Sequence, residues 1–219
     1  MKTPLLSFLF FLVIFGACIS DRQPASAVDY SLLVNPFIGT DFTGNTYPGA
    51  QAPFGMVQLS PDNGLPGWDR ISGYYYPDST IAGFSHTHLS GTGAGDLYDI
   101  SYMPVTLPYR EAEAPLGIHS KFRHSDEEAS AGYYRVLLKD YNINVELTAT
   151  ERCGIQRYTF PKAQSAVFLN LKKAMNWDFT QDSHIEVVDS CTIQGYRFSD
   201  GWARGQRVFF RTRFSKPFR

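Results

Sequence analysis

Apolar and polar residues alternate most regularly in the second half of the chain. From Ile143 to Thr150 every second side chain is apolar, which is the period of a strand with one buried face. Residues 134–138 precede this strand across a short turn at 140–142, so the two segments predict a hairpin. Further strand patterns recur at short intervals, at 157–160, 166–171, 185–188, 192–198 and 207–214. The spacing predicts an all-β fold, an antiparallel β-sandwich.

The segment 35–117 is organised differently and is crowded with turn-forming pairs. Glycine and asparagine tolerate positive φ and proline presets its own φ, so these pairs end strands. They are Asn35-Pro36, Pro48-Gly49, Asn63-Gly64 and Pro66-Gly67. The apolar runs between them, such as 56–59 and 71–76, predict short strands joined by long loops. We expect function in these loops.

The first 18 residues are expected to be a secretory signal rather than part of the fold. Lys2 precedes an apolar stretch at 5–15, too short for the roughly 20 residues that span a bilayer. Small residues directly before Cys18 predict lipoprotein processing, with Cys18 lipidated. Alternatively, Cys18 is incidental to an ordinary cleavage site. Residues 19–29 are then a flexible tether and 30–219 the domain, with membrane contact only through the lipid.

Composition limits the class of protein. The 219 residues are 43% hydrophobic and carry a net charge of -1, so the chain can bury a core but offers no positive excess to nucleic acid. Cys153 and Cys191 have no metal-type spacing. They are interpreted as two buried free thiols, with a single disulfide as the alternative for an exported protein.

Two segments concentrate candidate chemistry, 67–76 and 83–96. They combine aromatic rings, carboxylates, imidazoles and glycines, a mixture that binds sugars through ring stacking and hydroxyl pairing. Trp68 follows a turn and is expected to be exposed. His86 and His88, two residues apart, would share one side of a strand and could hold a metal with Asp96 or Asp99. A hydrogen-bonded core histidine is the favoured interpretation of one of them.

Several longer motifs are similar to the start of glycoside hydrolase family 92, and they cover nearly everything from Tyr30 onward. They read VNPFIGT (34–40), YPGA (47–50), PFGMVQLSPD (53–62), IAGFSHTHLSGTG (81–93), GYY (132–134), VELTAT (145–150), RYTFP (157–161) and FSKPF (214–218).

This resemblance implies a bacterial, exported, calcium-dependent, exo-acting α-mannosidase that inverts configuration and acts on mannose-containing glycans. The family pairs an N-terminal β-sandwich with an (α/α)6 barrel. The acid, the base and the calcium ligands are expected in that barrel, which this chain lacks. The chain is therefore interpreted either as truncated at its C-terminus or as a complete small domain. No catalytic or metal residue is therefore predicted here. The implied sugar contacts are Trp68 and, more weakly, Asp69, His86 and His88.

The chain departs from the family pattern at two places. Gln156 stands where a histidine is expected, and Arg70-Ile71 replaces a more usual Trp-Cys.

The sequence as a whole allows three interpretations. The chain is the substrate-contacting domain of a truncated or split mannosidase of the periplasm or outer membrane, a stand-alone carbohydrate-binding lipoprotein, or a structural interaction domain. The resemblance predicts that it does not hydrolyse glycans alone.

Overall fold

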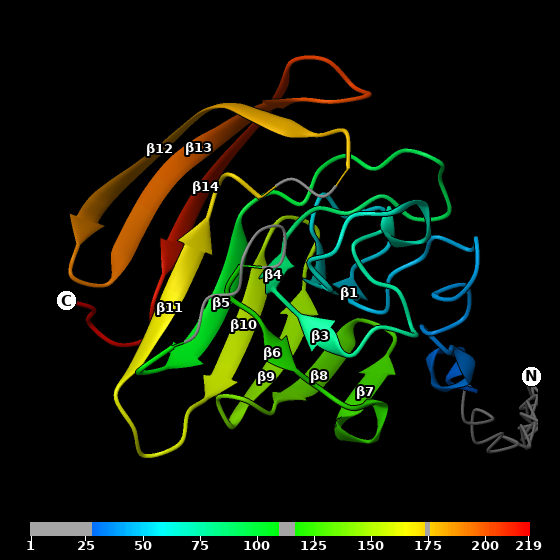
Figure 1. Ribbon diagram of the computed structural model, residues 1–219, viewed down its shortest axis with the longest axis horizontal. Helices are drawn as coiled ribbons and strands as arrows, with labels where there is room; N and C mark the ends of the chain where they lie inside the picture. The colour runs from blue at the N-terminus through cyan, green and yellow to red at the C-terminus, as the bar shows by residue number, and fades with distance from the viewer. Residues whose placement is uncertain (1–27, 110–116, 174–175) are drawn as a thin grey trace, which may run out of the picture.

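The computed structural model describes residues 28–109, 117–173 and 176–219 (Figure 1). The predicted signal at 1–18, Cys18 and all of the tether except 28–29 therefore lie outside the described residues. Within these ranges the ordered elements are β-strands and three short 3-10 helices. None of the helices described there is long and apolar enough to cross a membrane.

The elements follow one another as short strands first and longer strands later. The bounds are η1 Tyr30–Leu33, β1 Ala50–Gln51, β2 Gln58–Asp62, η2 Trp68–Arg70, β3 Thr80–Ile81, β4 Gly83–Ser85, β5 Ser101–Thr106, β6 Ser120–Lys121, η3 His124–Asp126, β7 Glu127–Ser130, β8 Tyr133–Leu138, β9 Ile143–Ala149, β10 Gly154–Thr159, β11 Ser165–Asn170, β12 Phe179–Asp189, β13 Thr192–Asp200 and β14 Gln206–Arg213.

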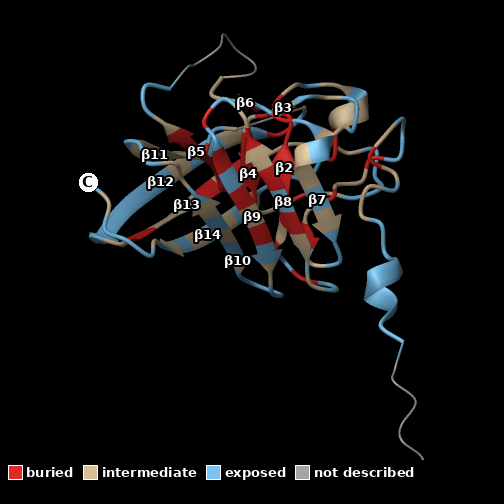
Figure 2. Cartoon of the chain, turned by 90° about the horizontal axis from the view of Figure 1, so that it is seen from below, coloured by how far each residue is buried: buried red, intermediate tan, exposed pale blue. Residues whose placement is uncertain are grey.

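Two antiparallel sheets form the sandwich. One has the strand order β1-β2-β4-β5-β11 and the other β10-β9-β8-β7. Their facing side chains make the main core, to which Leu59, Phe84 and Val105 contribute from one sheet and Val136 and Leu147 from the other. Full burial of such a side chain contributes about 1.5–3 kcal/mol. Figure 2 shows the buried residues gathered in these strands.

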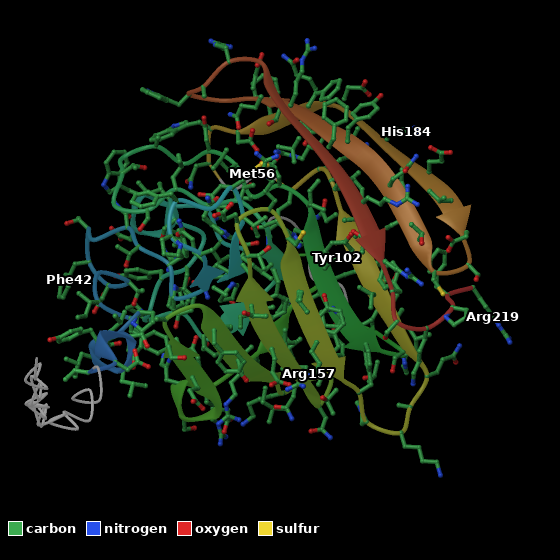
Figure 3. The ribbon with its side chains drawn as sticks, turned by 180° about the vertical axis from the view of Figure 1, so that it is seen from behind. Phe42, Met56, Tyr102, Arg157, His184 and Arg219 are labelled. Carbon is green, nitrogen blue, oxygen red and sulfur yellow. The ribbon has the colours of Figure 1, made fainter. Side chains whose placement is uncertain are left out.

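A third sheet, β12-β13-β14, lies against the five-stranded sheet and is much more exposed (Figures 1 and 2). A smaller apolar cluster joins the two, in which Tyr102 and Leu171 pack with Val208 and Phe210. Tyr102, labelled in Figure 3, also shares a 2.6 Å hydrogen bond with the hydroxyl of Thr212 on β14. Burial raises the pKa of Tyr102 to about 12, so this hydroxyl stays neutral.

A second link between the third sheet and the sandwich is polar. Arg197 on β13 is fully buried and donates to Asp99 (2.6 Å) and Asp178. It also donates to the carbonyl oxygens of Leu171 and Lys173, at 3.1 Å each. Asp99 lies between β4 and β5, and the other partners lie between β11 and β12. One guanidinium therefore fixes β13 to two loops of the sandwich.

The sequence predictions for the second half are confirmed. The hairpin is β8–β9, with register pairs from Tyr133↔Thr148 to Leu138↔Ile143. Its turn places Asn142 at φ 51°. The later strand patterns correspond to β10, β11, β13 and β14. The pattern at 185–188 marks only part of β12, because the rest of that strand is polar and exposed.

Two expectations were wrong. Residues 71–76 form a turn and irregular chain, because Gly73 (φ 89°) turns the backbone against Asp62 and His88. Both cysteine thiols are free as predicted, but they are not both buried. Cys153 is exposed and Cys191 is partly buried, because Cys153 lies in the turn between β9 and β10, where its N–H donates to Thr150.

Replacing Arg197 by methionine should destabilise the chain strongly. The variant leaves Asp99 and Asp178 buried without their cation, which costs about 3–5 kcal/mol of unfolding free energy. Urea unfolding followed by tryptophan fluorescence measures the loss. The control is Arg211→Met, because Arg211 is exposed and bonds Gln194 at 3.1 Å. Equal unfolding midpoints for the two variants would show that the buried guanidinium does not hold the sheets together.

Candidate functional site

The three tryptophans of the chain, Trp68, Trp177 and Trp202, lie on separate loops that meet at one short segment, Gly93–Asp96. A Cβ placed on Gly93 would be 3.5 Å from the Trp68 ring. The carbonyl oxygen of Gly95 accepts from the backbone N–H of Trp177 (3.3 Å). The carboxylate of Asp96 accepts from the backbone N–H of Trp202 (2.9 Å). We call the three tryptophans and this segment the tryptophan cluster.

Glycine is required at the centre of the tryptophan cluster. A Cβ on Gly95 would lie 2.6 Å from the Cβ of Asn176, and a Cβ on Gly201 would lie 2.2 Å from Asp96. Side chains at either position would force the loops apart. Gly95 and Gly201 therefore allow the loops to pack closely.

Trp68 is held by its own short helix. The helix η2 begins after Gly67, whose φ of 149° is favoured by glycine. Arg70 at its end donates twice to Asp78, at 2.6 Å each, and its guanidinium lies 4.9 Å from the ring centre of Tyr75. The sequence departure at Arg70-Ile71 thus has a structural use, since Arg70 anchors the turn and Ile71 is buried.

Trp68 and Trp177 form an edge-to-face pair, with ring centroids 5.9 Å apart. The N–H of Gly67 donates to the side chain of Asn176 (3.2 Å), which ties the two loops together. The exposed fractions are 56% for Trp68 and 47% for Trp177, and 76% for Trp202. Large aromatic side chains exposed together on ordered loops are typical of a binding surface.

Asp96 organises the loop that bears Trp202. One carboxylate oxygen accepts from Trp202, and the other accepts from the N–H of Ala203 (2.8 Å) and the amide of Gln206 (3.1 Å). Asp96 is itself buried. The carboxylate of Asp96 therefore holds the turn between β13 and β14 and does not face solvent.

His88 is part of a buried ion cluster beside this surface. Its Nδ1 donates to the carbonyl oxygen of Gln58 (2.7 Å), and its Nε2 lies 2.8 Å from Asp62 and 3.0 Å from Ser85. Lys173 donates to the other oxygen of Asp62 at 3.1 Å. Both nitrogens of His88 are occupied inside the protein, an arrangement suited to holding loops together.

His86 points to different partners. Its Nδ1 donates to the carbonyl oxygen of Ile100 (2.8 Å), and its Nε2 lies 3.5 Å from Gln156. Burial lowers the pKa of His86, which favours the neutral ring. The strand β4 ends at Ser85, so the expected strand geometry for the two histidines does not hold. Gln156, the other departure from the family pattern, contacts His86 and accepts from Tyr158 (2.7 Å).

The carboxylates near the tryptophan cluster are already engaged, Asp62 and Asp99 by cationic side chains and Asp96 by amides. Among the described residues no three His, Cys, Asp or Glu side chains form a group able to hold a metal. Asp69 is partly exposed beside Trp68. The sequence names Trp68 as a candidate sugar contact, and that role stays a prediction. It does not name Trp177 and Trp202, because each stands in a loop whose neighbours carry no recognisable motif.

The fold and the cluster define an all-β domain that presents tryptophans from clamped loops, and comparisons with known proteins give its family. Residues 33–219 match the Glycosyl hydrolase family 92 N-terminal domain. The chain belongs to this family.

Solved relatives share the fold. A family GH92 α-mannosidase from Bacteroides thetaiotaomicron, solved with mannoimidazole, has a TM-score of 0.81 and 38% identity, over 85% of this chain and 25% of that one. A family GH92 inverting mannosidase from the same species has a TM-score of 0.70 and 26% identity, over 89% and 26%.

A curated relative is described as an uncharacterized secreted glycosidase of Arthroderma benhamiae. It is 28% identical over 138 residues, which are 58% of this chain and 17% of the relative. The chain thus spans about a quarter of the solved relatives and less of the curated one.

The ion cluster at Asp62 should make stability depend on acid pH. Burial opposes ionisation of Asp62, but Lys173, His88 and Ser85 outweigh it and hold its pKa below the ordinary value. The folded chain therefore binds fewer protons than the unfolded chain. The contribution of Asp62 is complete above its unfolded pKa of about 3.9 and is lost as pH falls through the lower folded value.

We therefore expect Asp62→Asn to lower the unfolding free energy at pH 7 by about 3–5 kcal/mol, and this difference to shrink below about pH 4. Urea unfolding at several pH values measures it. Glu128→Gln is the control, because Glu128 makes an exposed pair with Arg135 that contributes little. A difference for Asp62→Asn that is the same at every pH would contradict this account.

Proposed function

We propose that this chain is the substrate-contacting N-terminal domain of an exported, exo-acting, inverting α-mannosidase that releases mannose from mannose-containing glycans. Family membership and the α-mannosidases among the solved relatives support the reaction class. The secreted relative supports export. The observation that carries the proposed role of this domain is the tryptophan cluster. All three tryptophans are exposed, and hydrogen bonds to buried or partly buried side chains hold the segments that carry them.

The chemistry of the cluster suits a sugar. A pyranose ring presents C–H groups on its faces and hydroxyls at its rim, so exposed indole rings bind its face and neighbouring polar groups bind its rim. Trp68 and Trp177 supply the rings. Asp69 follows Trp68 directly and is partly exposed, so its carboxylate can reach a sugar hydroxyl. His88, which the sequence also predicts as a sugar contact, is buried and both its nitrogens are bonded.

Hydrolysis needs an acid and a base on opposite sides of the glycosidic bond, about 6.5–9.5 Å apart in inverting enzymes. The buried carboxylates at this end of the domain have structural partners, as described for Asp62, Asp96 and Asp99. The catalytic pair is therefore assigned to the remainder of the full-length enzyme, the expected (α/α)6 barrel. This chain contributes binding and orientation of the sugar.

The calcium implied by the family does not fit the described residues of this chain. Calcium takes six to eight oxygen ligands, whereas the buried carboxylates here already accept from Arg197, Lys173 and backbone amides. We assign the calcium ligands to the barrel as well.

A second candidate function is a stand-alone carbohydrate-binding lipoprotein. It is favoured by one observation, that the Trp68–Trp177 pair is built by this chain without another domain. In that case Cys18 would anchor the domain to a bacterial membrane, and sugar binding would be the whole function.

Substitution of Trp68 by alanine should weaken binding of methyl α-mannoside at least tenfold, or about 1.4 kcal/mol, because the stacking ring is removed. NMR titration of the purified chain measures the affinity. Phe54→Ala is the control, since Phe54 is a fully exposed aromatic residue whose neighbour Gly55 lies against Glu151, between β9 and β10.

Two outcomes would contradict the proposal. Equal affinities for Trp68→Ala, Phe54→Ala and the unaltered chain would exclude Trp68 as a sugar contact. Calcium-dependent release of mannose by the purified chain alone would contradict the assignment of catalysis to another domain.

A further inference from the structure

A groove of about 430 Å³ lies at the start of β12, where its lining residue Phe179 follows Trp177 by two positions in the chain. Its lining residues come from β12 and from the loop before it, and they are Lys172, Phe179, Thr180, Gln181, Asp182 and Ser183. Its volume falls within the roughly 300–1,000 Å³ that is usual for small-molecule sites. The tryptophan cluster as defined above includes none of these residues.

The groove lies close to Trp177 along the chain. Phe179 follows Trp177 by two residues, a distance of at most about 7 Å along the chain. Asp178 between them is buried and clamped by Arg197. Both aromatic rings are about half exposed. The clamp that fixes Trp177 therefore also fixes Phe179.

The polar groups of the groove are held in place by β13. The hydroxyl of Tyr196 donates to Asp182 at 3.0 Å, and the amide of Gln181 donates to Asp200. The register of β12 against β13 shifts between Thr180 and Asp182. Such a bulge re-aims the side chains that follow it, and here it lets both Gln181 and Asp182 line the groove.

The mixture of groups selects a class of ligand. Lys172 brings one positive charge and Asp182 one negative charge, so the groove has no net attraction for an anion such as phosphate. Hydroxyl, amide, carboxylate and ammonium groups around one exposed aromatic ring suit a neutral ligand rich in hydroxyl groups.

We propose that this groove is a second sugar subsite, in which Phe179 and Asp182 bind a further residue of the glycan whose terminal mannose contacts Trp68 and Trp177. The subsite rests on the proposed function, because the tryptophan cluster must bind the first sugar. It extends that function by making the domain sensitive to the length of the glycan.

The test compares methyl α-mannoside with α-linked mannotriose by NMR titration of the full chain. The unaltered chain should bind the trisaccharide at least fivefold more tightly. Phe179→Ala should reduce the affinity for the trisaccharide to that for the monosaccharide, and should leave the monosaccharide affinity unchanged. Asp182→Asn should remove part of the same gain. Trp68→Ala should weaken binding of both ligands.

The control is Phe54→Ala, because Phe54 is a fully exposed phenylalanine that is not among the residues lining the groove. It should keep the fivefold preference. Equal binding of the two sugars by the unaltered chain, or loss of the preference in Phe54→Ala as in Phe179→Ala, would overturn the second subsite and leave the proposed function standing. Binding of neither sugar would overturn both.

Discussion

The guanidinium of Arg197 is the interaction on which the arrangement of this domain depends. It is buried where the three-stranded sheet meets the sandwich, and its donors are used by Asp99, Asp178 and backbone carbonyls of the loop after β11. A buried cation is tolerated only when it is paired and fully hydrogen-bonded. The two loops must therefore stay in place for β13 to pack at all, and stability and loop geometry are coupled.

Because buried polar groups fix these loops, the loops can hold large aromatic rings in place at the surface. Trp177 adjoins Asp178, and Trp202 is held by Asp96, so the exposed rings sit directly on buried polar anchors. Binding by rings that are already in place avoids the cost of ordering them. The exposed tryptophans proposed as sugar contacts are thus held by buried polar groups, whereas the two sheets of the sandwich are held together by the apolar core.

The sequence predicted the parts that depend on local periodicity. The alternation at Ile143–Ala149 could only bury one face, and the hairpin followed from it. The ion clusters could not be predicted, because Arg197 and Asp99 are 98 residues apart. No local sequence pattern around either residue indicates that the two interact. Trp68 was a candidate from the aromatic segment 67–76 and from the family resemblance, whereas Trp177 and Trp202 become neighbours of the same segment only through the fold. The sequence predicted only residues 185–188 of β12, because most of this strand is exposed and polar and therefore lacks the apolar alternation by which strands are recognised.

The most direct test of this account uses the three tryptophans themselves. Each indole N–H gives one signal in a ¹⁵N–¹H NMR spectrum of the full chain, and each can be assigned by substitution to phenylalanine. On titration with methyl α-mannoside, the signals of Trp68 and Trp177 should shift together and saturate at one concentration. Unchanged signals for both residues up to the solubility limit of the sugar would contradict the claim that the clamped loops form a sugar-contacting surface.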